Sequence, residues 1–333
     1  MTTPGSSLAD PTSGRVWTFG EAMAALITSG HRPAEHASTL QVGIGGAEFN
    51  VAVGLARLGH PVTYISVVGD DPWGRRIQRE LRAEGVDGRV RVTSDSFTGA
   101  YLREHRTQDL VRATYLRRGS AASLLTRSDI DQVTSVRGDV LHLTGLTPAI
   151  SGTAASAWLH AAAQAHQADA QVSLDVNYRS NVSTPLEAAN LFAAVAGHVH
   201  TVMASIEEAQ VVTGRPSLAK PADAADALAE ALPNATDVVI KNGAEGSMHV
   251  DSHGSVTEAT ALPVAVTDLV GAGDAFAAGY LSGLLDGKPP AGRLDRGHAC
   301  AAFVVSTHGD WEGAPRRDEL ALAPALTLKE VHR

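Results

Sequence analysis

The residues best suited to chemistry lie in one glycine-rich segment, Val266-Thr-Asp-Leu-Val-Gly-Ala-Gly-Asp-Ala-Phe-Ala-Ala-Gly-Tyr280. From Phe276 onward apolar residues recur four positions apart, which predicts a helix that begins near the glycines. The first backbone N–H groups of a helix lack an intrahelical partner and carry partial positive charge, so an anion can bind there. Because Gly271 and Gly273 have no Cβ atom, they leave these amides open to a phosphate group.

Asp274 directly follows the glycines, where an acid would repel a phosphate unless it had a separate task. We expect it to accept the proton of a hydroxyl group that attacks a γ-phosphoryl group. The amides of Gly271, Ala272 and Gly273 would stabilise the charge that develops there. The alternative is an ordinary first-turn acid that the helix dipole favours, with glycines that allow close packing. Both interpretations fit the segment on its own.

Composition excludes several classes of protein. The 333 residues carry a formal net charge of −9, which argues against a general nucleic-acid or membrane-surface binder. A single cysteine, Cys300, excludes an internal disulfide and a cysteine-cluster metal site, so we expect a reducing cytoplasm. Residues 1–14 are small and polar and predict a disordered tail rather than a signal peptide. No apolar stretch is long enough to span a bilayer.

The rest of the chain alternates between apolar strand patterns and alanine-rich helical patterns. Strands are predicted at residues 15–21, continuing through 22–28, and at 62–68, 140–143, 171–176, 199–204, 238–241 and 256–266. A helix is expected to open within residues 41–50 and to stop at Gly59. This alternation predicts an α/β fold with a central, mostly parallel sheet that has helices on both faces.

Two segments, residues 99–106 and 111–119, flank a short polar stretch and predict a hairpin. Apolar and charged residues partly alternate in both segments, which indicates a sheet with one face exposed to solvent, such as a lid over a cleft. We expect this small β-sheet lid to form from about residues 22–42 and 95–120, within a domain of residues 15–320 that is followed by a C-terminal segment, 321–333. A partner's lid could pair with it, so we expect a homo-oligomer.

Other motifs fail on spacing. Gly43 and Gly45 suggest a dinucleotide fingerprint, but Glu48 stands where the third glycine belongs, which disfavours an oxidoreductase. Lys288 follows a glycine but precedes a proline, so no phosphate-binding loop of the Walker type is present. His249 and His253 would form a metal pair only on a helix, and the turn residues between them argue against one.

Two sequence motifs, one near each end of the chain, resemble the two motifs of a known protein family. Gly45-Gly-Ala-Glu-Phe-Asn50 resembles the amino-terminal sugar-binding motif of the ribokinase, or PfkB, family, and Asp268-Leu-Val-Gly-Ala-Gly-Asp274 resembles its carboxy-terminal motif. The resemblance runs from about Val16 to Gly313. Within the family the chain is most similar to 2-keto-3-deoxygluconate kinases, in residues 99–103, 115–123, 141–148, 173–179 and 309–315. It implies a ribokinase-like fold, with ATP and Mg²⁺ as cofactors.

The resemblance also implies roles for individual residues. Those that would contact the sugar acid are Gly46, Tyr101, Tyr115, Arg117, Arg179, Asp274 and Asp310, with the two arginines on its carboxylate. Those that would bind ATP are Asn177, Ser205, Lys241, Asn242, Gly243, Ala244, Glu245, Gly246, Gly271, Ala272 and Gly273. Glu208 would hold magnesium through water. Leu269 and Val270 replace the commoner small or hydroxyl residues, which leaves the monovalent-cation (K⁺) dependence of some relatives open.

Residue chemistry points independently to an anionic sugar, because the guanidinium fork matches a carboxylate. Arg117 and Arg118 are neighbours on a predicted strand, so only one can face inward, and each could be a solvated charge instead. Arg179 follows a buried strand, where ligands of α/β sheets gather. Tyr101 and Tyr115 could simply pack on the hairpin.

The function expected from the sequence is ATP-dependent phosphorylation of O6 of 2-keto-3-deoxygluconate, with small-molecule partners only. 2-Keto-3-deoxygalactonate, fructose and 5-keto-2-deoxygluconate are alternative substrates, and a sugar-acid-binding relative without catalysis is an alternative function.

Overall fold

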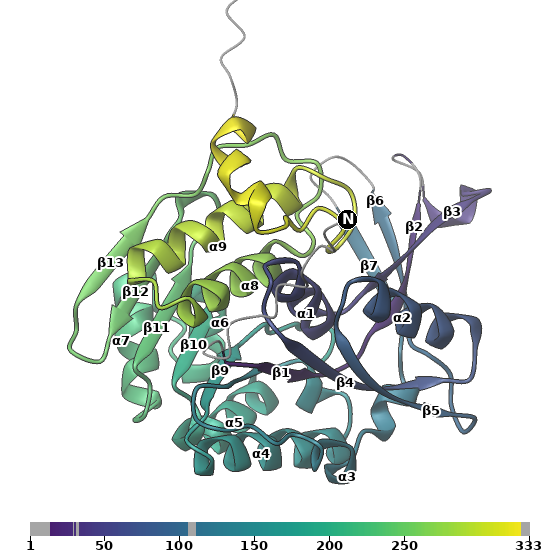
Figure 1. The fold of residues 1–333 in the computed structure, drawn as a ribbon, viewed down its shortest axis with the longest axis horizontal. Coiled ribbons are helices and arrows are strands. Elements are labelled where there is room, and N and C mark those ends of the chain that lie inside the picture. The colour runs from purple at the N-terminus through teal and green to yellow at the C-terminus, as the bar shows by residue number, and fades with distance from the viewer. Residues whose placement is uncertain (1–13, 29, 31–32, 106–110, 328–333) are drawn as a thin grey trace, which may run out of the picture.

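In a computed structural model, residues 14–28, 30, 33–105 and 111–327 are described, and they form two sheets with surrounding helices (Figure 1). The predicted tail at residues 1–13, the predicted turn at 107–110 and the last residues, 328–333, lie outside the described residues. The larger sheet has nine strands in the order β13-β12-β11-β10-β9-β8-β1-β4-β5. These strands are β1 (Val16–Phe19), β4 (Val62–Gly69), β5 (Asp87–Thr93), β8 (Val140–Thr144), β9 (Gln171–Asp175), β10 (Thr201–Ala204), β11 (Asp237–Lys241), β12 (Ser247–Asp251) and β13 (Val256–Ala259).

Neighbouring strands from β5 to β11 pair in parallel, whereas β12 and β13 add an antiparallel edge. The carboxyl ends of the parallel strands therefore meet along one edge of the sheet. The predicted strands at 62–68, 140–143, 171–176, 199–204 and 238–241 are confirmed, and so is the mostly parallel architecture.

Helices cover both faces of this sheet (Figure 1). The helices are α1 (Ala47–Arg57), α2 (Pro72–Ala83), α3 (Arg127–Ile130), α4 (Gly152–Gln167), α5 (Pro185–Val195), α6 (Ile206–Thr213), α7 (Pro221–Ala231), α8 (Ala272–Leu285) and α9 (Pro290–Val305). One apolar core joins the sheet to α3–α7, around Trp158. A second joins the opposite face to α1, α2, α8 and α9, around Phe49 and Phe276. No helix in the described ranges is long and apolar enough to cross a membrane.

The smaller sheet has the order β3-β2-β6-β7 and uses β2 (Met23–Thr28), β3 (Leu40–Gly45), β6 (Ala100–His105) and β7 (Val111–Leu116). Strands β6 and β7 form the antiparallel pair that the sequence predicts. Strand β7 is largely exposed, and β2 contributes buried residues on the inner side. This small sheet contributes residues to the same cleft as the large one.

Three predicted elements were wrong in detail. Residues 41–45 form strand β3 rather than the start of a helix, and α1 begins only at Ala47. Gly46 separates the two, because its φ of 151° suits glycine and a Cβ there would lie 2.3 Å from the carbonyl oxygen of Glu21. Residues 23–28 do not extend β1 but pair in the small sheet. Strand β13 ends at Ala259, so a loop, not a strand, leads to the glycine turn.

Candidate active site

The glycine turn starts helix α8, as the sequence predicts. Gly271 is the N-cap residue, with a φ of 81° that favours glycine. A Cβ atom at this position would lie 1.8 Å from the carbonyl oxygen of Asp310, so the close approach of the two backbone segments also requires glycine. Asp274 stands in the first turn of the helix. The first-turn amides of α8 thus border the cleft described next.

A cleft of about 550 Å³ lies where the two sheets meet the start of α8. It brings together most of the predicted site residues, which are Gly46, Tyr101, Tyr115, Arg117, Asn177, Arg179, Glu208, Lys241, Gly271, Gly273, Asp274 and Asp310. It does not bring in the others, which are Ala272, Ser205, Asn242, Gly243, Ala244, Glu245 and Gly246. The predicted sugar contacts therefore converge in one place, whereas much of the predicted adenosine border lies outside the cleft.

Asp274 is half-buried, and its hydrogen-bond partners are neutral. Its Oδ2 accepts a hydrogen bond of 2.8 Å from the side-chain amide of Asn50, and its Oδ1 accepts one of 3.3 Å from Asn177. Burial raises the pKa of Asp274 to about 7, against the hydrogen bond from Asn50, which lowers the pKa, while the charge of Asp175 raises it further. A carboxylate with a pKa near neutral pH is suited to take a proton during a reaction.

The arginines that line the cleft have different partners. Arg117 forms an ion pair with Glu21, with 2.5 Å between Nη2 and Oε2, and lies over the ring of Tyr115. Arg118 is exposed, so the prediction that only one of the two neighbours faces inward is confirmed. Arg179 donates to the backbone oxygen of Tyr178 at 3.2 Å, and within the described residues it forms no ion pair.

Arg103, which was not predicted from the sequence, is a buried cation of the same cleft. Its guanidinium forms ion pairs of 2.8 Å with both Asp268 and Asp310. The hydroxyl of Tyr101, two residues earlier on β6, donates to Asp310 at 2.5 Å. Burial raises the pKa of Asp310 to about 6, although Arg103 and Tyr101 lower it. Strand β6 of the small sheet is thereby fixed to the backbone segments on either side of the glycine turn.

The cleft holds a second set of charged groups, Lys241 and Glu208. The ammonium of Lys241 lies 2.7 Å from both carboxylate oxygens of Asp175. Glu208 accepts hydrogen bonds from the backbone N–H of Tyr178 at 3.1 Å and of Ser205 at 2.8 Å. Burial raises the pKa of Glu208, against the charge of Lys241. The hydroxyl of Ser205 in turn accepts from the N–H of Glu208, which makes the pair a capping box for α6.

Several cleft residues were not predicted from the sequence. They are Glu21, Glu48, Asn50 and Arg103, and Asp175, which does not line the cleft itself but binds Lys241, was also not predicted. Glu48 is buried and accepts from the hydroxyls of Thr144 and Thr147, and burial raises its pKa. Asn50 ends the amino-terminal motif, which is the signal that could have identified it. Nothing in the local sequence marks Arg103 among the other charged residues of its strand.

The parallel sheet, the β-sheet over its edge, and the acid after a glycine turn together define a class of α/β kinase that phosphorylates small molecules. The sequence matches the pfkB family carbohydrate kinase over residues 14–317, and the chain belongs to this family. It is therefore a carbohydrate kinase.

Individual relatives are similar over nearly their full lengths. The 2-dehydro-3-deoxygluconokinase of Bacillus subtilis is 34% identical over 310 residues, which cover 91% of this chain and 93% of that protein. The 2-dehydro-3-deoxygalactonokinase of Haloferax volcanii is 32% identical and covers 88% and 91%. The crystal structure of a PfkB protein from Polaromonas sp. JS666 superposes with a TM-score of 0.81 at 34% identity, covering 93% of this chain and 99% of that one.

Proposed function

We propose that the protein transfers the γ-phosphoryl group of ATP to the 6-hydroxyl of 2-keto-3-deoxygluconate, which is 2-dehydro-3-deoxygluconate. The observation that carries this proposal is the position of Asp274, a half-buried carboxylate with side-chain amide partners, in the cleft beside Gly271 and Gly273 at the start of α8. The similarity to a 2-dehydro-3-deoxygluconokinase supports the choice of sugar.

The charges of the cleft support an anionic sugar. Arg103 and Lys241 are each paired with aspartates, and Arg117 with Glu21. Arg179 is the cleft arginine without a carboxylate partner in the part of the chain that the structure describes. A substrate carboxylate would supply that partner, and Arg117 lies on the same cleft to share it.

In the proposed reaction Asp274 orients the 6-hydroxyl and receives its proton as the new O–P bond forms. An ionised carboxylate is too weak a base to remove the proton beforehand, so proton transfer accompanies or follows bond formation. The amides of residues 271–273 hold the charge of the transferring group, because such transfer depends mainly on positioning and charge stabilisation.

Mg²⁺ would enter with ATP and neutralise phosphate charge. Both carboxylate oxygens of Glu208 already accept backbone N–H groups, which suits contact with a hydrated ion rather than direct ligation. Among the described residues, no group of three or more acidic, histidine or cysteine side chains is arranged to hold a metal. The hydrogen bonds of Glu208 fit an Mg²⁺ ion that is bound mainly by the phosphates of ATP.

The first test is a panel of four acceptors with Mg·ATP: 2-keto-3-deoxygluconate, its galactonate epimer, fructose and 5-keto-2-deoxygluconate. ADP release measures turnover. We expect the largest kcat/KM for 2-keto-3-deoxygluconate and the smallest for neutral fructose, which leaves Arg179 unpaired. A preference for fructose would contradict the sugar-acid assignment, and no ADP release with any sugar would favour a binding protein without catalysis.

The second test concerns the carboxylate. Arg179→Ala should raise KM for the sugar acid by roughly 10–100-fold, the loss expected for a charged hydrogen bond. KM for ATP should change little. The exposed Arg118→Ala is the matched control and should leave both constants unchanged. An unaltered KM for the sugar acid in Arg179→Ala would remove Arg179 from substrate binding.

A further inference from the structure

An ion pair joins Lys241, which lines the cleft, to Asp175, which lies beneath it and does not line the cleft. Lys241 is the last residue of β11 and Asp175 the last of β9, and β10 lies between these two strands. The side chain of Asp175 is 1% exposed and that of Lys241 is 17% exposed. The lysine thus reaches across a strand and fixes its ammonium at the carboxyl edge of the sheet, where it lines the cleft.

The ammonium has a free donor. A lysine ammonium carries three N–H groups, and two of them are directed to the two oxygens of Asp175, each at 2.7 Å. No other acceptor bonds Lys241 Nζ in the described ranges. Asp175 therefore holds the group in one orientation and leaves the third N–H for a ligand.

The free donor lies beside the glycine turn. Lys241 Nζ is 3.7 Å from the point where a Cβ atom on Gly273 would stand. A phosphoryl group bound to the amides of residues 271–273 would occupy the same small region. The positive charge of Lys241 also acts on Asp274, whose pKa it lowers, and the carboxylates of Asp175 and Glu208 raise the pKa of Lys241 against its burial.

A purely structural role does not account for this pair. Two charges taken out of water stabilise a fold little, and apolar residues of similar volume often serve as well. The pair lies at the reactive edge of the sheet, within reach of the general base, rather than in either apolar core.

We propose that Lys241, oriented by Asp175, contacts the phosphoryl group during its transfer and supplies positive charge on the side opposite the sugar. This role rests on the proposed kinase reaction. The bond from the γ-phosphorus to the bridging oxygen of ADP breaks, the bond to the sugar oxygen forms, and the hydroxyl proton passes to Asp274. Lys241 keeps all its protons. It is a catalytic residue in this reaction, and Asp175 is a positioning residue.

The first experiment compares Lys241→Met, Lys241→Arg and Asp175→Asn in the full chain, with melting temperature as the check on folding. Lys241→Met should lower kcat by about 10²–10³-fold, the loss typical of one donor to a transition-state charge. KM for the sugar acid should stay within about threefold in all variants. Lys241→Arg should keep more of kcat than Lys241→Met. A folded Lys241→Met variant with kcat within threefold of wild type would overturn the proposal.

The pH profile tests the placement of the pair beside Asp274. Lys241 lowers and Asp175 raises the pKa of Asp274, so the acidic limb of kcat/KM should move to higher pH in Lys241→Met and to lower pH in Asp175→Asn. The loss of kcat in Lys241→Met at a pH where Asp274 is ionised is the result that a merely structural pair would not give. Shifts in the same direction would contradict the placement of Lys241 near the base.

A chemical rescue provides a second route. Lys241→Cys treated with 2-bromoethylamine creates a lysine analogue at this position, and we expect at least a tenfold recovery of kcat. The native Cys300 is buried, and wild type treated in the same way serves as the control. If residue 241 is modified and kcat does not recover, the ammonium group at this position does not contribute to turnover.

The outcomes distinguish this inference from the proposed function. If wild type phosphorylates another sugar, the substrate is wrong and the same variants are compared with that sugar. If wild type phosphorylates none, Mg·ADP with aluminium fluoride is the probe. Wild type should then bind ADP more tightly when aluminium fluoride is present, and Lys241→Met should lose that gain. If aluminium fluoride tightens ADP binding equally in wild type and in Lys241→Met, the role of Lys241 is wrong whatever the substrate is.

Discussion

Helix α8 has an aspartate at each end, and the two have opposite properties. Asp274 lies in the first turn and Asp286 is the C-cap residue, about 18 Å away at 1.5 Å per residue. The helix dipole favours a negative charge at the first position and opposes it at the second. The pKa values follow the reverse order, because that of Asp274 is raised to about 7 and that of Asp286 is lowered from 3.8.

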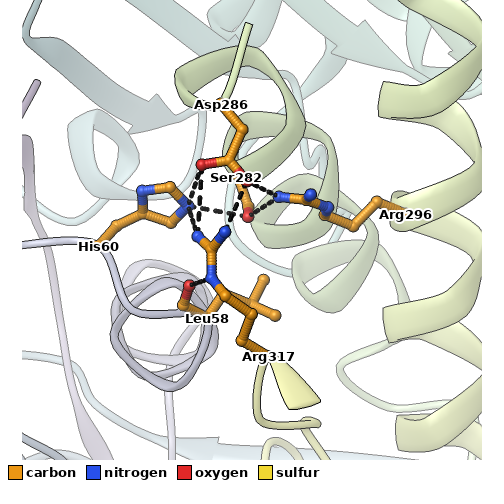
Figure 2. Close-up of polar contacts among 6 residues, drawn as sticks. All are labelled: Leu58, His60, Ser282, Asp286, Arg296 and Arg317. Carbon is orange, nitrogen blue, oxygen red and sulfur yellow. Dashed lines mark hydrogen bonds and ion pairs between the residues drawn. The ribbon is translucent and has the colours of Figure 1, made fainter. Parts of the chain in front are cut away.

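Figure 2 shows why Asp286 stays charged. Two guanidinium groups bind its carboxylate, with Nη1 of Arg296 at 2.6 Å and Nη1 of Arg317 at 2.7 Å. Burial would raise the pKa of Asp286, but these hydrogen bonds together lower it. His60 joins the cluster through Ser282 at 2.8 Å, and burial lowers the pKa of His60 to about 4, so it is neutral there.

Among the residues that the structure describes, no cation forms an ion pair with Asp274. Its bonded partners are the amides of Asn50 and Asn177, while Arg179 and Lys241 lower its pKa only through their charge. The comparison teaches that contact partners, rather than the helix dipole, set the direction in which the pKa of an acid on this helix moves. The Asp286 cluster binds the segment that holds Arg317 to α8, whereas the Asp274 carboxylate has amide partners.

The largest difference should appear in turnover. Asp274→Asn should lower kcat by about 10²–10⁴-fold, the contribution of a general base, while ATP binding persists. Asp286→Asn is the matched control on the same helix and should stay within about twofold. Steady-state kinetics and ATP titration measure both. Near-wild-type turnover in Asp274→Asn would show that Asp274 is not the general base, and Asp274 and Asp286 would then not differ in function.

Folding stability should change in opposite directions. The folded pKa of Asp274 lies above its unfolded value, so its contribution to stability is full at acidic pH and is lost as the pH rises through about 7. Asp274→Asn should therefore stabilise the fold at pH 8, on the order of 2 kcal/mol. The folded pKa of Asp286 is lowered, so its contribution exists above the unfolded pKa and is lost as pH falls.

Asp286→Asn should accordingly destabilise the fold at pH 8 by about 1–3 kcal/mol, since it leaves two guanidinium groups without their carboxylate. Denaturant unfolding of both variants measures these changes. A change of the same sign in both variants would contradict the opposite pKa shifts of Asp274 and Asp286.

The smallest expected effect is a pH dependence. Because Asp274 must be ionised to take a proton, kcat/KM should fall about tenfold per pH unit below a midpoint near 7. Asp286→Asn should leave the midpoint in place. A midpoint near the ordinary value for aspartate, about 4, would show that burial does not raise the pKa of the base.

Much of this arrangement follows from local sequence. The parallel strands, the helix after the glycines and the acid in its first turn come from periodicity and from the special backbone freedom of glycine. Strand β3 was missed because its glycines also fit a turn before a helix, and only pairing with β2 settles its conformation.

The partners in the site could not be predicted in the same way. Asn50 is 224 positions from Asp274, and Lys241 is 66 positions from Asp175. Such contacts depend on the order of strands in the sheet and on how helices cover it, which single-sequence patterns do not encode. Local patterns identify the reactive groups, whereas the pKa values of those groups depend on distant neighbours.

The single guanidinium of Arg103 has a mechanical consequence. It belongs to the small sheet, yet it forms ion pairs with both Asp268 and Asp310 beside the glycine turn. Swinging β6 away would leave two acids facing each other without a cation, so the resting position of that strand is held electrostatically. Below about pH 6, where Asp310 gains a proton, this restraint weakens and the small sheet gains freedom to move.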